Sequence, residues 1–316
     1  MMNNLKILHV GFIGSGKTAS EHAKVIKKFK KYYIKSVFSK TEKNAKKFAK
    51  VFKIKNYYDD INLFLKEKYD LLIICLPPDK LLNVLKKILK TDSNIFIEKP
   101  LGLNFNEANK IYKIYKKKKL KFFVGYNRRF LGSVVKLKKK ISESKNKLFL
   151  YVQDQQDTNI AKKYGHNKKV IKNWMYANSI HTIDLISFFL RGNPIKFENK
   201  NILKNKKKVI TSKILFSSGD QARYVSYWNI PANWKISILS KNSFFQLNPL
   251  EKLEINKNGK NKLFANFVYD RRFKPGFYRQ FEEIDKALKN KKNCAVTLFD
   301  AIKSVHVTKK IYENFK

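Results

Sequence analysis

Short apolar segments alternate with helical patterns throughout residues 5–125, and this alternation limits the possible folds more than any other feature of the chain. The segment Asp70–Leu76 shows no polar alternation, which is typical of a strand buried on both faces of a parallel sheet. The whole pattern predicts an α/β domain built on a doubly wound parallel sheet. Its expected strands are residues 5–13, Tyr33–Phe38, Asp70–Leu76, Asn94–Glu98 and Lys121–Gly125, separated by helices that include Glu42–Val51, Ile61–Lys66, Leu81–Leu89 and Asn106–Lys118.

After residue 125 the rhythm changes, because strand patterns follow one another with few helices between them. One helix is predicted at about Ser179–Leu190, and a helical end runs from Phe277 to Phe315. We therefore expect two domains, residues 1–124 and 125–316, the second being an α+β domain with a large, mostly antiparallel open sheet. Its expected strands are Lys147–Gln153, Lys208–Phe216, Gln221–Trp228, Trp234–Leu239, Ser243–Gln246 and Leu250–Ile255.

The charge of the chain is extreme, with 69 Lys and Arg residues against 24 Asp and Glu residues and a formal net charge of +45. Such a charge raises the question of nucleic-acid or membrane binding. The lysines, however, are spread along the whole chain without a base-reading motif, and the apolar runs are too short for a membrane span, so neither partner is expected. The two cysteines, Cys75 and Cys294, form no C-x-x-C pair, and no signal peptide is recognisable. We expect no metal site and a cytoplasmic location.

The loop after the first expected strand, HVGFIGSGKTASEHA (residues 9–23), matches two phosphate-binding signatures. Counted from Gly11, it reads G-x-x-x-x-G-K-T, the P-loop of a kinase or nucleotide triphosphatase. In that interpretation Lys17 contacts the phosphates and Thr18 binds Mg²⁺. A P-loop enzyme also needs an acidic residue at the end of a second strand, and Asp154 is the one candidate that ends an apolar run.

Counted from Gly14, the same loop reads G-x-G-x-x-A, the dinucleotide-binding turn of a Rossmann fold. Here the strand continues through Ile13, Gly14 makes the tight turn and Gly16 lets a pyrophosphate approach the backbone. Ala19 lies where the following helix packs on the strand, and the amide groups at the helix start bind the pyrophosphate. The first interpretation predicts phosphoryl transfer, whereas the second predicts hydride transfer with a nicotinamide.

Further motifs favour the second interpretation. They are CLPPD (75–79), IEKPLG (97–102), GYNRRF (125–130), NSIHTIDL (178–185) and PGFYRQFEEIDKAL (275–288). In this order and spacing, over nearly its whole length, the chain resembles the glucose–fructose oxidoreductase, inositol dehydrogenase and rhizopine-catabolism family (Gfo/Idh/MocA). The resemblance implies an NAD(P)-dependent oxidoreductase that acts on the secondary alcohol or ketone of a small sugar, cyclitol or nucleotide-linked sugar. It also implies a homo-oligomer, a dimer or tetramer, and a branch connected with surface-polysaccharide metabolism.

The resemblance further implies that Lys99 and His181 are the catalytic residues that hold and ionise the reacting hydroxyl. Lys99 follows a strand end, where open α/β sheets bind their ligands. His181 lies in the first turn of an apolar helix, and imidazoles exchange protons near neutral pH. Asp184, one helical turn further on, is expected to have a structural role.

One position departs from the family. Members with a complete Lys–Asp–His set carry an aspartate four residues before the histidine, and this chain has Ala177 there. The neighbouring Asn178 cannot ionise. Two alternatives follow: Lys99 and His181 suffice for catalysis, or the chain is a catalytically impaired, dinucleotide-binding regulator or scaffold of the same fold.

The end of the second strand selects between nicotinamide cofactors. NAD-binding turns place an acidic residue there, whereas this chain has Ser39 and Lys40, which suit a 2′-phosphate, so NADP(H) is favoured over NAD(H). The expected cofactor-binding residues are Gly14, Ser15, Gly16, Lys17, Thr18, Ser39, Lys40, Leu76, Pro77 and Glu98. The expected residues on the substrate side are Tyr126, Asn127, Arg128, Trp174 and Asn178.

Overall fold

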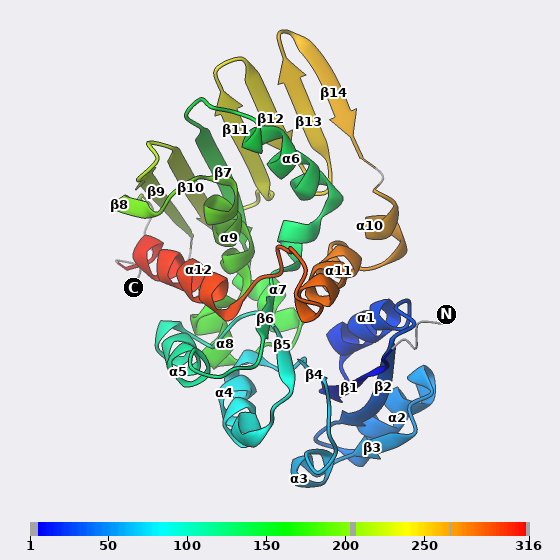
Figure 1. Cartoon of the computed structure of the whole chain (residues 1–316). Helices are drawn as coiled ribbons and strands as arrows, with labels where there is room; N and C mark the ends of the chain where they lie inside the picture. Colours follow the sequence, from blue (N-terminus) through cyan, green and yellow to red (C-terminus); the bar gives the residue numbers. More distant parts are fainter. Residues whose placement is uncertain (1–5, 203–206, 266, 314–316) are drawn as a thin grey trace, which may run out of the picture. The chain divides into compact units, whose positions relative to one another are not determined.

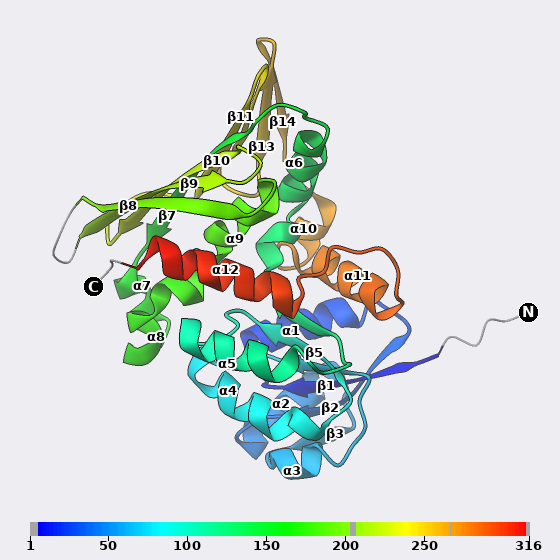
Figure 2. The ribbon, with the colours of Figure 1, turned by 60° about the vertical axis from the view of Figure 1, so that its left-hand side comes forward.

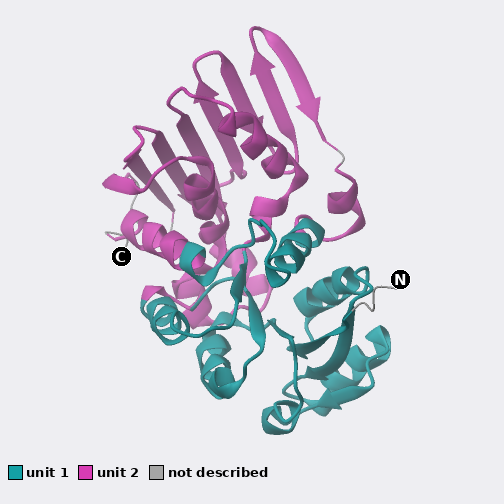
Figure 3. Ribbon diagram, in the orientation of Figure 1, with its two compact units in different colours: residues 1–102, 106–125, 277–300 teal, residues 103–105, 126–276, 301–316 magenta. Residues whose placement is uncertain are grey.

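The computed structural model describes residues 6–202, 207–265 and 267–313, which form two compact units (Figure 3). Unit 1 comprises Met1–Gly102, Asn106–Gly125 and Phe277–Asp300. Unit 2 comprises Leu103–Phe105, Tyr126–Gly276 and Ala301–Lys316. The chain therefore returns to unit 1 after it has built most of unit 2. No helix among the described residues is both long and apolar enough to cross a membrane.

Unit 1 is built on a six-stranded parallel sheet in the order β3-β2-β1-β4-β5-β6, the order of a dinucleotide-binding Rossmann fold (Figure 1). The predicted doubly wound parallel sheet is confirmed. Its core is aliphatic and aromatic, because the central strands β1 and β4 are covered on both faces. The strands are β1 (Leu8–Ile13), β2 (Tyr32–Phe38), β3 (Asn56–Tyr58), β4 (Leu71–Ile74), β5 (Asn94–Glu98) and β6 (Phe122–Gly125).

The helices of unit 1 connect these strands, and one helix comes from far along the chain. That helix, α11, packs on α1, where the Phe277 ring stacks on the His22 ring with centroids 4.3 Å apart. Tyr32 of β2 donates a 2.7 Å hydrogen bond to Asp285 of α11. The helices are α1 (Lys17–Ile26), α2 (Glu42–Phe52), α3 (Ile61–Phe64), α4 (Pro78–Lys87), η1 (Ile88–Lys90), α5 (Phe105–Tyr115) and α11 (Phe277–Leu288).

Unit 2 contains an eight-stranded sheet in the order β14-β13-β12-β11-β7-β10-β9-β8. All neighbouring strands are antiparallel except β7 and β10, so the predicted mostly antiparallel open sheet is confirmed. The strands are β7 (Phe149–Gln156), β8 (Pro194–Asn201), β9 (Lys208–Phe216), β10 (Gln221–Trp228), β11 (Lys235–Ser240), β12 (Ser243–Leu247), β13 (Leu253–Lys257) and β14 (Lys260–Phe264).

Three helices of unit 2, α6, α9 and α12, lie on one face of this sheet (Figures 1 and 2). Along β7 every second residue from Leu150 is buried beneath them, and the residues between are half-buried on the other face. The helices of unit 2 are η2 (Asn127–Phe130), α6 (Gly132–Ser142), α7 (Thr158–Lys163), α8 (Lys168–Lys172), η3 (Met175–Ser179), α9 (Ile180–Phe189), α10 (Val268–Arg272) and α12 (Leu298–Ile311).

Two predicted elements differ from the structure. The helical end expected from Phe277 to Phe315 is two helices, because Asn290 adopts a left-handed conformation and the backbone of Val296 accepts a hydrogen bond from β6; Phe315 lies outside the described residues. The strand expected at Leu250–Ile255 begins at Leu253, because a turn closed by a hydrogen bond from Lys252 to the Pro249 carbonyl occupies the preceding residues. The sequence analysis also missed β3, β8 and β14, which lie at edges of the two sheets.

Candidate functional site

The carboxyl ends of four parallel strands meet at one edge of the unit 1 sheet. Ile13 of β1 pairs with Phe38 of β2 and with Ile74 of β4, and Ile74 pairs with Ile97 of β5. The residues that follow these four positions therefore lie side by side. They are Gly14, Ser39, Cys75 and Glu98, so the register brings four of the motifs identified in the sequence to one edge.

Gly14 makes the tight turn that leads from β1 to α1. It has φ +104°, and a Cβ atom at this position would lie 2.3 Å from the Cys75 carbonyl oxygen. Gly16 differs, because a Cβ there would meet no atom within 4 Å. Gly16 is the N-cap of the ten-residue helix α1 and supplies no capping side chain, so amide groups at the helix start are available to an anion.

The same geometry excludes a P-loop. Gly11 and the two residues after it are paired within β1 and cannot form a phosphate cradle. A Cβ on Gly11 would lie 2.8 Å from the rings of Phe64 and Tyr69, which explains this glycine by packing. Asp154, the one candidate acid for a P-loop enzyme, belongs to unit 2 and is buried within β7 instead of following a strand end.

The end of β2 lies against the glycine turn. Ser15 donates a 2.8 Å hydrogen bond to Ser39, which is buried, and the Ser39 amide is bound to the Tyr58 carbonyl. Lys40 follows and is exposed, as is Lys17 at the start of α1. The position that carries an acidic residue in NAD-binding turns is therefore occupied by a hydroxyl and an ammonium group.

Lys99 directly follows β5 and is half-buried, and its peptide bond to Pro100 is cis. Glu98 forms a 2.6 Å ion pair with His22, a buried residue of α1 that sequence reasoning missed. This pair ties the start of the Lys99 segment to the helix that follows the glycine turn. A Cβ on Gly125 of β6 would lie 3.2 Å from the Glu98 carboxyl, which places that side chain over β6.

In unit 2, His181 is a buried residue of α9, and the π-helical turn η3 leads directly into that helix. Its ring centroid lies 6.0 Å from that of Trp234, which precedes β11. The guanidinium group of Arg128 lies 5.6 Å from the centroid of the Trp234 ring and forms a 2.7 Å ion pair with Glu251. Trp234 was not among the predicted site residues, whereas Arg128 and His181 were.

Comparison with known proteins agrees with this geometry. Residues 8–126 match the family model GFO_IDH_MocA, described as an oxidoreductase family with an NAD-binding Rossmann fold. Over this segment, which contains all six strands of the unit 1 sheet, the chain is similar to the Gfo/Idh/MocA family. Myo-inositol 2-dehydrogenase of Thermotoga maritima is 23% identical over 135 residues, which are 42% of this chain and 40% of that protein. The alignment thus spans less than half of that relative.

Solved structures of dehydrogenases share the fold over nearly the whole chain. A dehydrogenase from Chromobacterium violaceum has a TM-score of 0.84 at 15% identity and covers 98% of this chain and 95% of its own. Levoglucosan dehydrogenase in complex with NADH has a TM-score of 0.80 at 15% identity, with 97% and 96% covered. UDP-N-acetylglucosamine 3-dehydrogenase from Acidithiobacillus ferrooxidans has a TM-score of 0.76 at 15% identity, with 96% of each chain covered.

The motif GYNRRF, which carries part of the family resemblance, is held mainly by internal contacts. Tyr126 is fully buried, and burial raises the pKa of its hydroxyl well above the ordinary value. Asn127 donates a 2.9 Å hydrogen bond to the Pro275 carbonyl. Arg129 forms two 2.6 Å hydrogen bonds with the buried Asp184, so Asp184 has the structural role that the sequence analysis expected.

Three residues near His181 in sequence, the expected substrate-side residues Trp174 and Asn178 and the departing position Ala177, occupy different environments. Trp174 is buried with its ring centroid 5.0 Å from that of His166. Ala177 is buried in η3. Asn178, also in η3, donates a 2.8 Å hydrogen bond to Gln156 of β7. The amide of Asn178 is thus already used within the fold.

A buried polar cluster lies behind the η3 turn and was missed in the sequence. At its centre Asp154 accepts hydrogen bonds from Gln156 (2.6 Å) and Tyr224 (2.5 Å), and Ser179 is within hydrogen-bonding reach. Tyr312 in turn contacts the hydroxyl groups of Tyr224 (2.9 Å) and Ser179 (3.3 Å). Burial raises the pKa of Asp154 to about 6. The sequence offered no clear signal for this cluster, because Phe149 and Tyr151 are apolar like the buried Leu150 and Val152.

Proposed function

We propose that this chain is an NAD(P)-dependent oxidoreductase that transfers a hydride between a nicotinamide cofactor and a secondary alcohol or ketone of a sugar-type substrate. The observation that carries the proposal is the glycine turn of unit 1. Its first glycine cannot accept a Cβ, its second is open, and the helix start beyond it has no capping side chain. These features fit a bound pyrophosphate.

The cofactor-binding residues follow from the aligned strand ends. Ser15, Gly16, Lys17 and Thr18 would hold the pyrophosphate at the start of α1. Leu76 and Pro77 follow β4 at the same edge and would contact the nicotinamide half, together with Glu98. When bound, the nicotinamide supplies the hydride acceptor or donor.

NADP(H) is the favoured cofactor in this proposal. Ser39, which accepts a hydrogen bond from Ser15, would donate one to the 2′-phosphate, and the exposed Lys40 would neutralise its charge. A charge-assisted hydrogen bond contributes about 1.5–3 kcal/mol, which corresponds to roughly ten- to hundredfold in affinity. The similar solved structures include levoglucosan dehydrogenase in complex with NADH, so a direct comparison of the two cofactors is needed.

Lys99 and His181 are the proposed catalytic residues. The Lys99 ammonium group would hydrogen-bond the reacting hydroxyl oxygen and hold it in one orientation, and the His181 imidazole would take or return the hydroxyl proton. The flat, partly exposed Trp234 beside His181 is suited to contact a sugar ring, because sugar C–H groups pack on aromatic faces. Arg128, held by Glu251 over the same tryptophan, would donate to substrate oxygens.

The substrate is proposed to be a polyhydroxylated ring, free or linked to a nucleotide. The named relatives act on a cyclitol, an anhydro sugar and a nucleotide sugar, and all three are rings with secondary hydroxyl groups. The Arg128 guanidinium suits a substrate with several oxygens or a phosphate. A place in surface-polysaccharide synthesis fits the nucleotide-sugar alternative.

One alternative is kept because Ala177 stands where related enzymes with the full catalytic set have an aspartate. In that alternative the chain binds the dinucleotide and acts as a regulator or scaffold. Binding and turnover therefore have to be measured separately. A fluorescence titration with NADPH and NADH, with ATP–Mg²⁺ as a control ligand, measures binding.

The titration uses Lys40→Ala and, as its matched control, Lys43→Ala, which removes an exposed lysine from α2. We expect tighter binding of NADPH than of NADH, a roughly tenfold loss of NADPH affinity in Lys40→Ala, and no loss in Lys43→Ala. An equal loss of NADPH affinity in both variants would show that the loss comes from the change in net charge and not from a specific contact of Lys40. Binding of ATP–Mg²⁺ without a nicotinamide signal would reject the oxidoreductase.

Turnover is measured by NADPH absorbance with myo-inositol, levoglucosan and UDP-N-acetylglucosamine as probes. We expect turnover with at least one ring of this class, and its loss in Lys99→Ala and His181→Ala with NADPH affinity retained. Retained affinity with no turnover in the wild type for any sugar-type ring would favour the regulator.

We also propose a homo-oligomer formed through the open face of the unit 2 sheet. Phe149 and Leu239 are paired neighbours on that face and are 40% and 45% exposed. Adjacent exposed apolar side chains of this kind mark association surfaces. Light scattering should give the mass of a dimer or tetramer, and Leu239→Lys should shift the protein toward the monomer. A monomeric wild type would show that this face of the sheet is not an association surface.

A further inference from the structure

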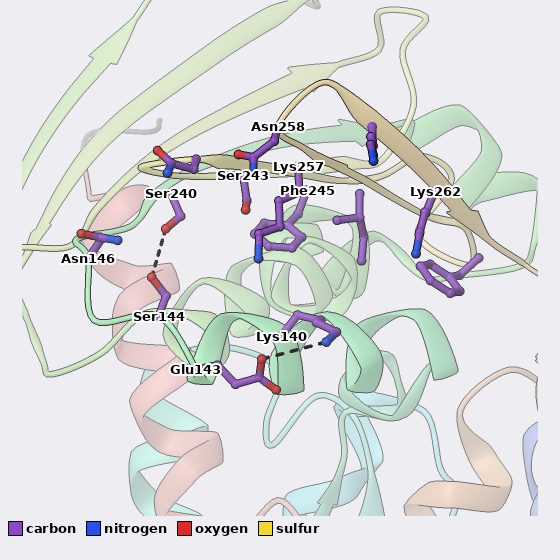
Figure 4. Close-up of a pocket in the computed structure, with 14 residues that line it drawn as sticks. Lys140, Glu143, Ser144, Asn146, Ser240, Ser243, Phe245, Lys257, Asn258 and Lys262 are labelled. Atoms are coloured by element: carbon purple, nitrogen blue, oxygen red, sulfur yellow. Dashed lines mark hydrogen bonds and ion pairs between the residues drawn. The ribbon is translucent and has the colours of Figure 1, made fainter.

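A groove of about 780 Å³ lies in unit 2 between α6 and the outer strands of the sheet (Figure 4). Apolar side chains line one part of it, and hydroxyl, amide and ammonium groups line the rest. Ser144 and Ser240 are joined across one end by a 3.0 Å hydrogen bond. Its ammonium groups belong to Lys140, Lys257, Lys260 and Lys262.

The strand register explains why three of these lysines converge. Residues Asn258 and Gly259, with φ +51° and +76°, form the two-residue turn between β13 and β14, a turn type that fixes the pairing of a hairpin. Lys257 therefore lies directly opposite Lys260, and Lys262 lies opposite Ile255. All three lysines share the face of the hairpin that is turned toward α6, and their side chains are exposed.

The lysines of this hairpin all lie on one of its two faces. The other face of β13 and β14 carries Glu254, Asn256, Asn261 and Leu263, which include no lysine. A chain that is rich in lysine throughout would place these side chains on either face. Like charges directly opposite each other in a sheet are destabilising, so an anion bound beside the exposed pair Lys257 and Lys260 would reduce their repulsion.

Within the described residues the groove itself contains little negative charge. Glu143 is the carboxylate that lines it, and this group is 3.9 Å from Lys140. No ion pair joins Lys257, Lys260 or Lys262 to a carboxylate of the described chain. The apolar part of the groove, Phe245 and Phe264 among its residues, lies beside these charges.

The groove is separate from the candidate site of unit 2. Trp234, which contacts His181, directly precedes β11, and Ser240, which lines the groove, ends that strand. Six residues of extended strand separate the two positions by roughly 20 Å. The groove is therefore distinct from the surroundings of His181 and Trp234.

We propose that this groove binds a soluble diphosphate-bearing ligand, with its phosphate oxygens on Lys140, Lys257, Lys260 and Lys262. A diphosphate carries several negative charges on adjacent groups, which matches lysines on opposite strands and a fourth on the facing helix. This assignment does not depend on the proposed hydride transfer. A bound diphosphate would offset the repulsion between the paired lysines.

Calorimetric titration with inorganic pyrophosphate at 150 mM salt tests the proposal. The groove variant is Lys257→Gln/Lys260→Gln/Lys262→Gln, and the matched control is Lys43→Gln/Lys46→Gln/Lys47→Gln, which removes the same charge from exposed positions of α2. We expect at least a tenfold loss of pyrophosphate affinity in the groove variant and less than a twofold change in the control. The triple Lys→Arg groove variant should retain binding.

Three results would overturn the proposal. Equal weakening in both glutamine variants would assign the attraction to net charge. Unchanged affinity in the groove variant would place the pyrophosphate elsewhere, the glycine turn of unit 1 included. A wild type that binds no pyrophosphate at this salt concentration would leave the groove without the proposed ligand. Thermal unfolding of each variant confirms that the folds compared are intact.

Discussion

Replacing Asp154 by asparagine should change how the stability of unit 2 depends on pH. Asp154 is fully buried on β7 and accepts hydrogen bonds from neutral groups, and no basic group of the described chain lies within ion-pair distance. Burial raises its pKa from the ordinary 3.8 to about 6. Between these values the folded state holds a proton that the unfolded state has released, so stability falls as the pH rises.

The magnitude follows from the two pKa values. Each pKa unit corresponds to about 1.4 kcal/mol, and ionising Asp154 in the fold should cost roughly 2 kcal/mol between pH 4 and pH 7.5. Asparagine has nearly the same shape and never ionises. The free energy of unfolding of Asp154→Asn, relative to that of the wild type, should therefore rise by about 2 kcal/mol from pH 4 to pH 7.5. Any hydrogen bond that the substitution weakens lowers stability equally at both pH values and does not affect this difference.

Tryptophan fluorescence makes the assay specific, because all three tryptophans of the chain, Trp174, Trp228 and Trp234, belong to unit 2. Urea unfolding followed by this signal at pH 4 and pH 7.5 gives the free energy of unfolding for each variant. Glu143→Gln, which removes a carboxylate with a 60% exposed side chain, is the control for net charge. A difference between Asp154→Asn and wild type that stays constant with pH would refute the argument.

Two further predictions compare matched pairs of variants. Gly14→Ala should prevent stable folding of unit 1 or strongly lower its melting temperature, because the new Cβ meets the Cys75 carbonyl oxygen at 2.3 Å. Gly16→Ala should fold normally and only weaken NADPH binding, and equal melting temperatures of the two variants would contradict this prediction. Asp184→Asn removes the buried carboxylate that pairs with the Arg129 guanidinium and should lower the free energy of unfolding by about 3–5 kcal/mol. Glu251→Gln breaks a more exposed ion pair and should lower it by about 1 kcal/mol or less. Similar losses for the two variants in urea unfolding would contradict a structural role for Asp184.

The sequence was sufficient for the features that depend on local periodicity. The alternation of strands and helices predicted the parallel sheet, and the further motifs, IEKPLG and GYNRRF among them, favoured the dinucleotide turn over the P-loop. The order of strands then aligned Gly14, Ser39 and Glu98 at one edge, since parallel strands end on the same side. These predictions hold because each depends on residues that are close in sequence or on a single topological rule.

Features created by distant packing could not be predicted in the same way. Asp154 is in phase with the buried Leu150 and Val152, but Phe149 and Tyr151 are apolar too, so the sequence does not show which face of β7 is buried. Nothing near it in sequence shows that Tyr224 donates a hydrogen bond to it, or that Tyr312 contacts the Tyr224 hydroxyl. A buried carboxylate is tolerated only where such partners are present, and those partners are 70 and more than 150 residues away.

The lysines also show what the sequence alone does not predict. Composition correctly suggested that most of them cover solvated faces, and Lys43, Lys46 and Lys47 of α2 are exposed in this way. The lysines of β13 and β14 differ only because an Asn258–Gly259 turn sets their register and α6 faces the side on which they converge. A count of charges treats both sets alike, whereas their positions in the fold separate the lysines that line the groove from those of α2, which do not.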